Sequence, residues 1–183
     1  SGSLADEQGL VYNDQMRRYT FRTNLESNLT NWLSLGMNST FIQRNTSDKP
    51  ANPTDALWMS PFGSLEYEDQ EPTLYVIRED VAKNPLYDAR LTEYEAIWNN
   101  LFTNFYAKIN APFLHGLSYR INFSPSIRWG HNYSYLRQDQ HREINNTSAS
   151  KFNQQDYDWV LENILTYKTR IGRDHDLDAT LLY

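Results

Sequence analysis

The sequence of 183 residues predicts an all-β fold, an antiparallel up-and-down meander of about six long strands that forms part of a transmembrane β-barrel. Three observations support this prediction. Apolar and polar side chains alternate with the period of two that places successive side chains on opposite faces of a strand. One alternating run is about twice the ordinary strand length. Short and long connections alternate along the chain, as they do in outer-membrane barrels.

The longest alternating run begins at Leu117 and ends near Gly130. Its odd-numbered positions carry Leu, Tyr, Ile, Phe, Pro and Trp, whereas its even-numbered positions carry Ser, Asn and two arginines, Arg120 and Arg128. Strands of soluble proteins average about 5–6 residues. A strand of this length with charge confined to one face is more typical of a barrel wall than of a soluble sandwich.

The same alternation recurs along most of the chain. We predict a flexible N-terminal segment at 1–15, long extracellular loops at 44–97 and 137–156, and strands at about 16–26, 32–43, 98–110, 117–131, 157–171 and 176–183. The connections between paired strands are otherwise short and polar or marked by Gly and Pro. Tight turns would therefore lie on one side of the sheet and long loops on the other.

One segment before the third predicted strand has a different period. Tyr87, Leu91, Tyr94, Trp98 and Leu101 are spaced as on one face of a helix. The spacing favours a short loop helix that leads into the strand, and an irregular loop is the alternative.

The composition excludes several classes of function. Seventeen Lys+Arg against 23 Asp+Glu give a net charge of −6, which argues against nucleic acid as a partner. The absence of cysteine removes disulfides, thiolate nucleophiles and cysteine-ligated metals. The sequence has no phosphate-binding, dinucleotide-binding or nucleophile-elbow motif. It therefore predicts neither an enzyme nor a cofactor, and no membrane-spanning helix, because no apolar run approaches ~18 residues.

Two acidic clusters contain the oxygen ligands that calcium prefers. One lies at 66–71 in the first long loop, and the other comprises Asp174, Asp176 and Asp178 with His175 beside them. Neither matches an EF-hand. A solvated loop face is the favoured interpretation of the first cluster, and His175 in the second is interpreted as a polar turn residue at the edge of a hairpin. No metal site is assigned, and calcium binding at 66–71 is left open.

The aromatic residues, 14% of the chain, suggest two roles. Trp129 and Trp159 lie on the apolar face near the second long loop, and Trp32 lies at the tight-turn side, as expected of two interfacial girdles. Trp98 falls on the polar face and breaks this pattern. Ordinary packing in a soluble sheet is the alternative. The first long loop carries candidate ligand-stacking residues, Trp58, Phe62, Tyr67 and Tyr75, which could equally pack the loop onto itself.

Several stretches together resemble the SusC/RagA family of TonB-dependent outer-membrane transporters of Bacteroidetes. They are Arg18–Leu25 followed by Asn31–Asn38, Asn84–Leu86, Asn104–Ala107 with Gly116–Arg120, and Trp159–Tyr167. The resemblance extends from about Met16 to the C-terminus. It implies that 16–183 is a partial TonB-dependent receptor barrel, a middle piece of a wall of about 22 strands, because no plug domain, TonB box or signal sequence is visible in these residues.

The resemblance also implies a function and partners. The chain would supply barrel wall and extracellular loops of an importer of oligosaccharide or oligopeptide. Its partners would be a SusD-like surface lipoprotein, outer-membrane lipid, and TonB–ExbB–ExbD acting through the missing plug. Residues expected to face the lumen and contact plug or substrate are Asn104, Lys108, Arg120, Asn122 and Arg128.

A soluble all-β carbohydrate-binding module with aromatic loops is the competing hypothesis. It accounts for the mean hydropathy of −0.73. It does not account for strands of this length with charge on one face.

Overall fold

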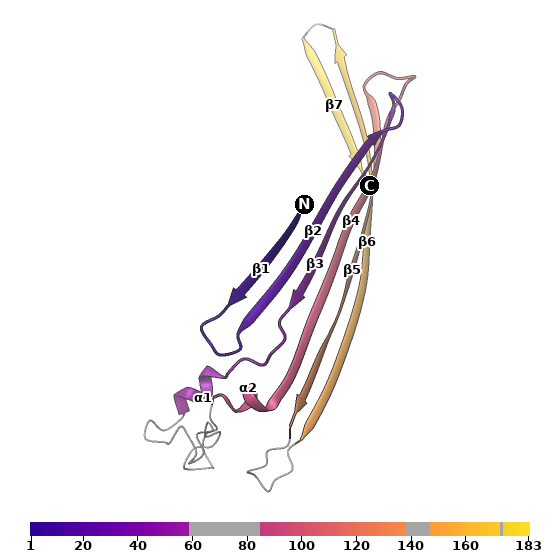
Figure 1. Ribbon diagram of the computed structural model, residues 1–183. Coiled ribbons are helices and arrows are strands. Elements are labelled where there is room, and N and C mark those ends of the chain that lie inside the picture. Colours follow the sequence, from indigo (N-terminus) through magenta and orange to yellow (C-terminus); the bar gives the residue numbers. More distant parts are fainter. Residues whose placement is uncertain (59–84, 138–146, 173) are drawn as a thin grey trace, which may run out of the picture.

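In the computed structural model, seven strands form one antiparallel sheet in the order β1-β2-β3-β4-β5-β6-β7 (Figure 1). The structure describes residues 1–58, 85–137, 147–172 and 174–183. Every strand pairs with its neighbour in sequence, so the sheet is an up-and-down meander. The predicted fold class is confirmed.

The strands from β2 to β6 are long, and among the described residues two short helices lie between the third strand and the fourth. The elements are β1 (Gly2–Gln8), β2 (Gln15–Asn28), β3 (Leu33–Asn45), α1 (Pro53–Trp58), α2 (Tyr87–Leu91), β4 (Thr92–Asn110), β5 (Leu117–Leu136), β6 (Ser148–Ile171) and β7 (His175–Leu182). Within the described ranges, no helix has the length and apolar character needed to cross a membrane.

The connections divide between two ends of the sheet, as predicted. The connections at 29–32, 111–116 and 172–174 define the tight-turn end, and those at 9–14, 46–91 and 137–147 define the loop end (Figure 1). Gly116 allows one tight turn, because its φ of 89° suits glycine and a Cβ there would collide with the carbonyl oxygen of Lys168.

The first strand was not predicted. Residues 1–15 were expected to be a flexible segment, but β1 pairs with β2 over its whole length, with Leu4 opposite Tyr19. Arg17 of β2 also binds Asp6 of β1, Nε to Oδ2, at 3.2 Å. The ordered sheet therefore begins before residue 16. The alternation could not reveal β1, because Leu4 is the only large apolar side chain in it.

Three strands extend further toward the loop end than the sequence indicated. β4 begins at Thr92 instead of 98, β5 ends at Leu136 instead of 131, and β6 begins at Ser148 instead of 157. The helical spacing ends with α2, a single turn, so Tyr94 and Trp98 lie on β4. At odd-numbered positions, which are mostly apolar along the rest of these strands, the extensions carry glutamates on β4, tyrosines on β5 and mostly polar residues on β6. The apolar–polar alternation that marks a strand is therefore weaker there.

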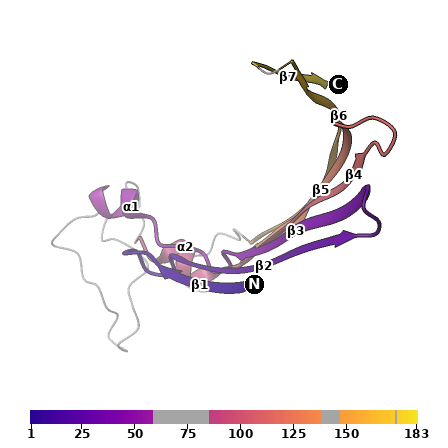
Figure 2. The same cartoon turned by 90° about the horizontal axis from the view of Figure 1, so that it is seen from above.

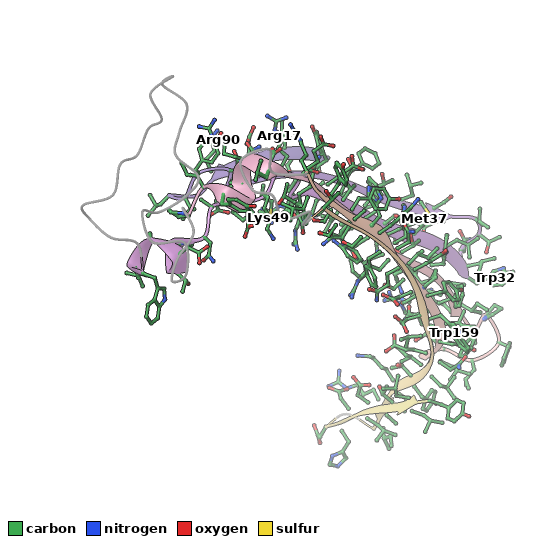
Figure 3. All side chains as sticks on the ribbon, turned by 90° about the horizontal axis from the view of Figure 1, so that it is seen from below. Arg17, Trp32, Met37, Lys49, Arg90 and Trp159 are labelled. Atoms are coloured by element: carbon green, nitrogen blue, oxygen red, sulfur yellow. The ribbon has the colours of Figure 1, made fainter. Side chains whose placement is uncertain are left out.

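The sheet is strongly curved, with one convex and one concave face (Figure 2). In every pair from β2–β3 to β6–β7, odd-numbered residues lie opposite odd-numbered residues. Consequently, odd-numbered side chains of β2 to β7 share one face. Met37 and Trp159 lie on the convex side, which identifies the odd-numbered face as convex (Figure 3).

The sheet is a single layer with very little core. Among the described residues, the buried apolar side chains are Ala51, Tyr87, Ala89 and Ala96, all in or near the loop end. The large apolar side chains of the strands are exposed or half-buried instead. Folding of this segment must therefore depend on what covers its faces, since burial of apolar surface is the main favourable term.

Candidate functional site

The convex face carries a band of apolar side chains, all exposed or half-buried, which is interrupted by a short row of hydroxyl residues, Thr23, Ser39 and Thr103. Phe21, Leu161 and Leu181 are 59%, 44% and 66% exposed, respectively, and all are odd-numbered. The pairing places rows of such residues side by side, for example Met37, Phe105, Phe123 and Leu161. Soluble monomers rarely expose an apolar surface of this extent.

The height of the band matches a bilayer. On β5 it extends from Leu117 to Trp129, twelve residues further along the strand. At ~3.4 Å per residue and the ~40° tilt of barrel strands, this corresponds to a height of roughly 30 Å. The hydrocarbon core of a bilayer is also about 30 Å thick.

Tryptophan marks one edge of the band at the loop end, but only in part as predicted. Trp129 lies at the last apolar row, where its ring centroid is 6.1 Å from that of Phe41. Trp159 does not lie at this edge. Because β6 begins at Ser148, its register places Trp159 opposite Pro125, one row from the middle of the band, with its ring 6.3 Å from Phe123. Its assignment to an interfacial girdle is therefore wrong.

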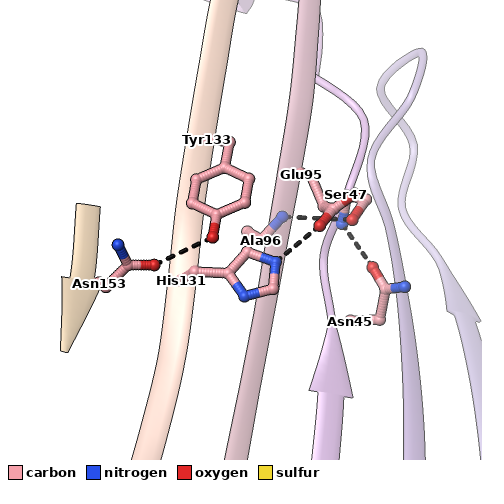
Figure 4. Close-up of polar contacts among 7 residues, drawn as sticks. All are labelled: Asn45, Ser47, Glu95, Ala96, His131, Tyr133 and Asn153. Atoms are coloured by element: carbon pink, nitrogen blue, oxygen red, sulfur yellow. Dashed lines mark hydrogen bonds and ion pairs between the residues drawn. The ribbon is translucent and has the colours of Figure 1, made fainter. Parts of the chain in front are cut away.

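Above Trp129 the convex face becomes polar. Glu95 Oε1 and His131 Nε2 are 2.6 Å apart, and the Tyr133 hydroxyl donates to Asn153 Oδ1 at 3.0 Å (Figure 4). The His131 ring stacks on Tyr133 with centroids 4.3 Å apart. These residues form a polar collar beyond the apolar band, at the depth where lipid head groups would lie.

The concave face carries the five residues predicted to face a lumen, all of them even-numbered on β4 and β5. Lys108 lies directly opposite Arg120. The Arg120 Nε–H donates to Asn122 Oδ1 at 2.8 Å, and the Asn122 amide donates to Glu162 Oε2 at 3.1 Å. Asn104 donates to Ser124 Oγ at 2.8 Å. The sheet thus places these five residues on one surface, with Arg128 nearer the loop end, where its Nε–H donates to Asn100 Oδ1 at 3.2 Å.

Two aromatic rings on the concave face cover glycines, an arrangement that the sequence prediction missed. Tyr106 covers Gly36 on the neighbouring strand, and the Arg120 guanidinium lies 4.5 Å from the centre of its ring. Trp98 covers Gly130, and its ring is 6.5 Å from Phe152. Trp98 thus lies on the polar face because a glycine across the strand leaves room for its ring. Finding these two pairs from the sequence would have required the register between the neighbouring strands, which alternation does not give.

The concave face is not purely polar. Phe102, Phe152, Val160 and Leu182 are even-numbered and between 44% and 63% exposed.

The predicted loop residues lie mostly outside the described structure. Phe62, Tyr67, Tyr75 and the acidic run at 66–71 are outside the described residues. Trp58 is the last residue of α1 and is 69% exposed.

The second acidic cluster is partly neutralised by ion pairs. Asp178 Oδ2 lies 2.7 Å from Lys168 Nζ, and Asp176 Oδ1 lies 3.6 Å from Arg170 Nε. Across the described part of the chain, no group of three or more potential ligands is arranged to hold a metal ion.

These observations define a class of fold, a curved segment of β-barrel wall with an apolar outer face. No protein-family model matches the chain, and no curated protein matches it. It is similar to a chain of the RagAB peptide importer, solved in an open-open state with a TM-score of 0.81 and in a closed-closed state with a TM-score of 0.80. Sequence identity is 18% to both.

The extent of the match is asymmetric. It covers 99% and 98% of this chain, respectively, and 21% of the importer chain in both states. The chain therefore spans about a fifth of the length of these structural relatives, and it shares the fold of that part.

Proposed function

We propose that this chain is a wall segment of an outer-membrane, TonB-dependent importer of the SusC/RagA kind. The observation that carries the proposal is the separation of the two faces. The convex face offers an apolar band of bilayer height, and the concave face offers polar and charged side chains. A barrel that separates lipid from an aqueous lumen requires this arrangement.

The substrate class that we propose is an oligopeptide or an oligosaccharide. The similarity to a peptide importer supports the first, and the exposed Trp58 beside the long loop is compatible with either. The partners would be a SusD-like surface lipoprotein and the TonB system, both acting on parts of the importer beyond this chain. A soluble carbohydrate-binding module would have to leave the convex band in water, at a large cost in hydrophobic free energy.

Cysteine accessibility tests the orientation of the wall. The chain has no cysteine, so single replacements report on one position each once any cysteine elsewhere in the full-length transporter is replaced. In the full-length transporter in intact membranes, we expect Ser126→Cys to react with a water-soluble maleimide and Ile127→Cys to resist it. These neighbours on β5 point to opposite faces. Equal labelling of both positions would contradict the proposal.

Import itself is tested in cells. Deletion of the full-length gene should abolish uptake of a labelled oligopeptide or oligosaccharide, and loss of TonB should have the same effect. Uptake that persists without either would refute the proposed activity even if the wall orientation were correct.

A further inference from the structure

We propose that the concave face of β2 to β5 binds ligands that carry carboxylate groups. This inference rests on the proposed function and narrows its substrate class. The even-numbered positions of these four strands carry six cations and one carboxylate, Glu26. The whole chain has a net charge of −6, so this surface has the opposite sign to the rest of the chain. We call the six cations the cationic strip: Arg18, Arg22, Arg44, Lys108, Arg120 and Arg128.

The register places like charges directly against one another. Arg18 lies opposite Arg44, and Lys108 lies opposite Arg120. Like charges opposite one another on neighbouring strands are destabilising. Among the described residues, one cation of the strip forms an ion pair: Arg18 lies 3.8 Å from Glu7 Oε1. These opposed like charges weaken the sheet, and such a cost without a structural gain indicates that the cations serve to bind a ligand.

An aromatic surface adjoins the arginines at the loop end. Arg44 lies opposite Trp98, which lies over Gly130 and approaches Phe152 on β6. Phe152 is 53% exposed. A carboxylate held by arginine beside a flat aromatic ring suits a chain that carries acidic groups and apolar or ring-shaped units in alternation.

Carboxylates on the neighbouring strand would confine such a ligand to the strip. The even-numbered face of β6 presents Asp156, Asp158 and Glu162. The two cations on this face, Lys168 and Arg170, pair with Asp178 and Asp176 of β7. An anionic ligand would be repelled from β6 and retained over β2 to β5. Two sources could supply the carboxylates, an acidic oligopeptide or a uronic-acid oligosaccharide.

Binding to the purified full-length transporter tests the inference. The probes are a decapeptide with four glutamates, the same peptide with four glutamines, an oligogalacturonate, and its methyl ester. At least one acidic probe should bind about tenfold more tightly than its neutral counterpart, and its affinity should fall with added salt. Preference for the peptide or for the uronate identifies the source, and either result supports the inference.

Variants connect the affinity to the strip. The double variant Arg18→Gln/Arg44→Gln should bind the acidic probe at least tenfold more weakly. It should fold at least as well as the unmodified protein, because a like-charge repulsion is removed. Lys168→Gln/Arg170→Gln is the matched control, since it also removes two positive charges from the same face but outside the strip, where both pair with carboxylates of β7, and it should leave affinity unchanged.

Two results would overturn the inference: equal binding of acidic and neutral probes, or an unchanged affinity in the double variant. Uptake distinguishes this failure from failure of the proposed function. A transporter that inserts and imports neutral probes without preferring acidic ones retains the proposed function and loses only the carboxylate specificity.

Discussion

A charge introduced at the middle of the convex band should severely destabilise the membrane-inserted state. Phe123 is the midpoint between Leu117 and Trp129, and it lies opposite Phe105 on one side and Leu161 on the other. An arginine at the midplane of a barrel's lipid face costs about 2–4 kcal/mol. Loss of the ring contact with Trp159 adds about 1 kcal/mol. We therefore expect Phe123→Arg to reduce the free energy of unfolding by about 3–5 kcal/mol.

The assay is folding of the full-length transporter into phospholipid vesicles, followed over a urea titration. Ser126→Arg is the matched control, because it introduces the same side chain three residues away on the concave face, opposite Asp158. It should change stability by less than about 1 kcal/mol. Ile121→Arg should fall between the two, because Asn163 lies opposite it as a polar partner. Equal losses for Phe123→Arg and Ser126→Arg would refute the assignment of the two faces.

Three further predictions concern packing and depth. Gly130→Ala should destabilise the transporter by about 1–3 kcal/mol, and more than Gly36→Ala, and urea titration of both variants checks the order. A Cβ at Gly130 comes nearest to the backbone oxygen of Ile97, whereas one at Gly36 comes nearest to the ring end of the Tyr106 side chain, which can move aside. Fluorescence quenching by lipids brominated deep in the acyl chain should affect Trp159 strongly and Trp129 weakly in single-tryptophan variants, and equal quenching would contradict the register of β6. Arg120→Ala should leave insertion into vesicles intact, because its side chain lies on the concave face; reduced insertion would count against that placement.

The orientation of most strand side chains followed from local sequence. Successive side chains on a strand point to opposite faces, so alternation alone placed Asn104, Lys108, Arg120, Asn122 and Arg128 on one surface, and the structure agrees. The same property identified the apolar face and the fold class. It failed at β1 and at the loop-end extensions of β4, β5 and β6, where few apolar residues mark the alternation.

Only the tertiary structure decided how deep each side chain lies in the apolar band and which side chains of other strands are its neighbours. Trp159 has the face that the sequence predicts but not the depth, because depth depends on the register between β5 and β6. The opposed pairs Arg18–Arg44 and Lys108–Arg120, and the rings over Gly36 and Gly130, join residues from different strands. Alternation reports the direction of a side chain from its own backbone, whereas register is a property of two strands, set by the hydrogen bonds between them. The sequence therefore determined which residues share the convex face and which share the concave face, and strand pairing determined which of them meet.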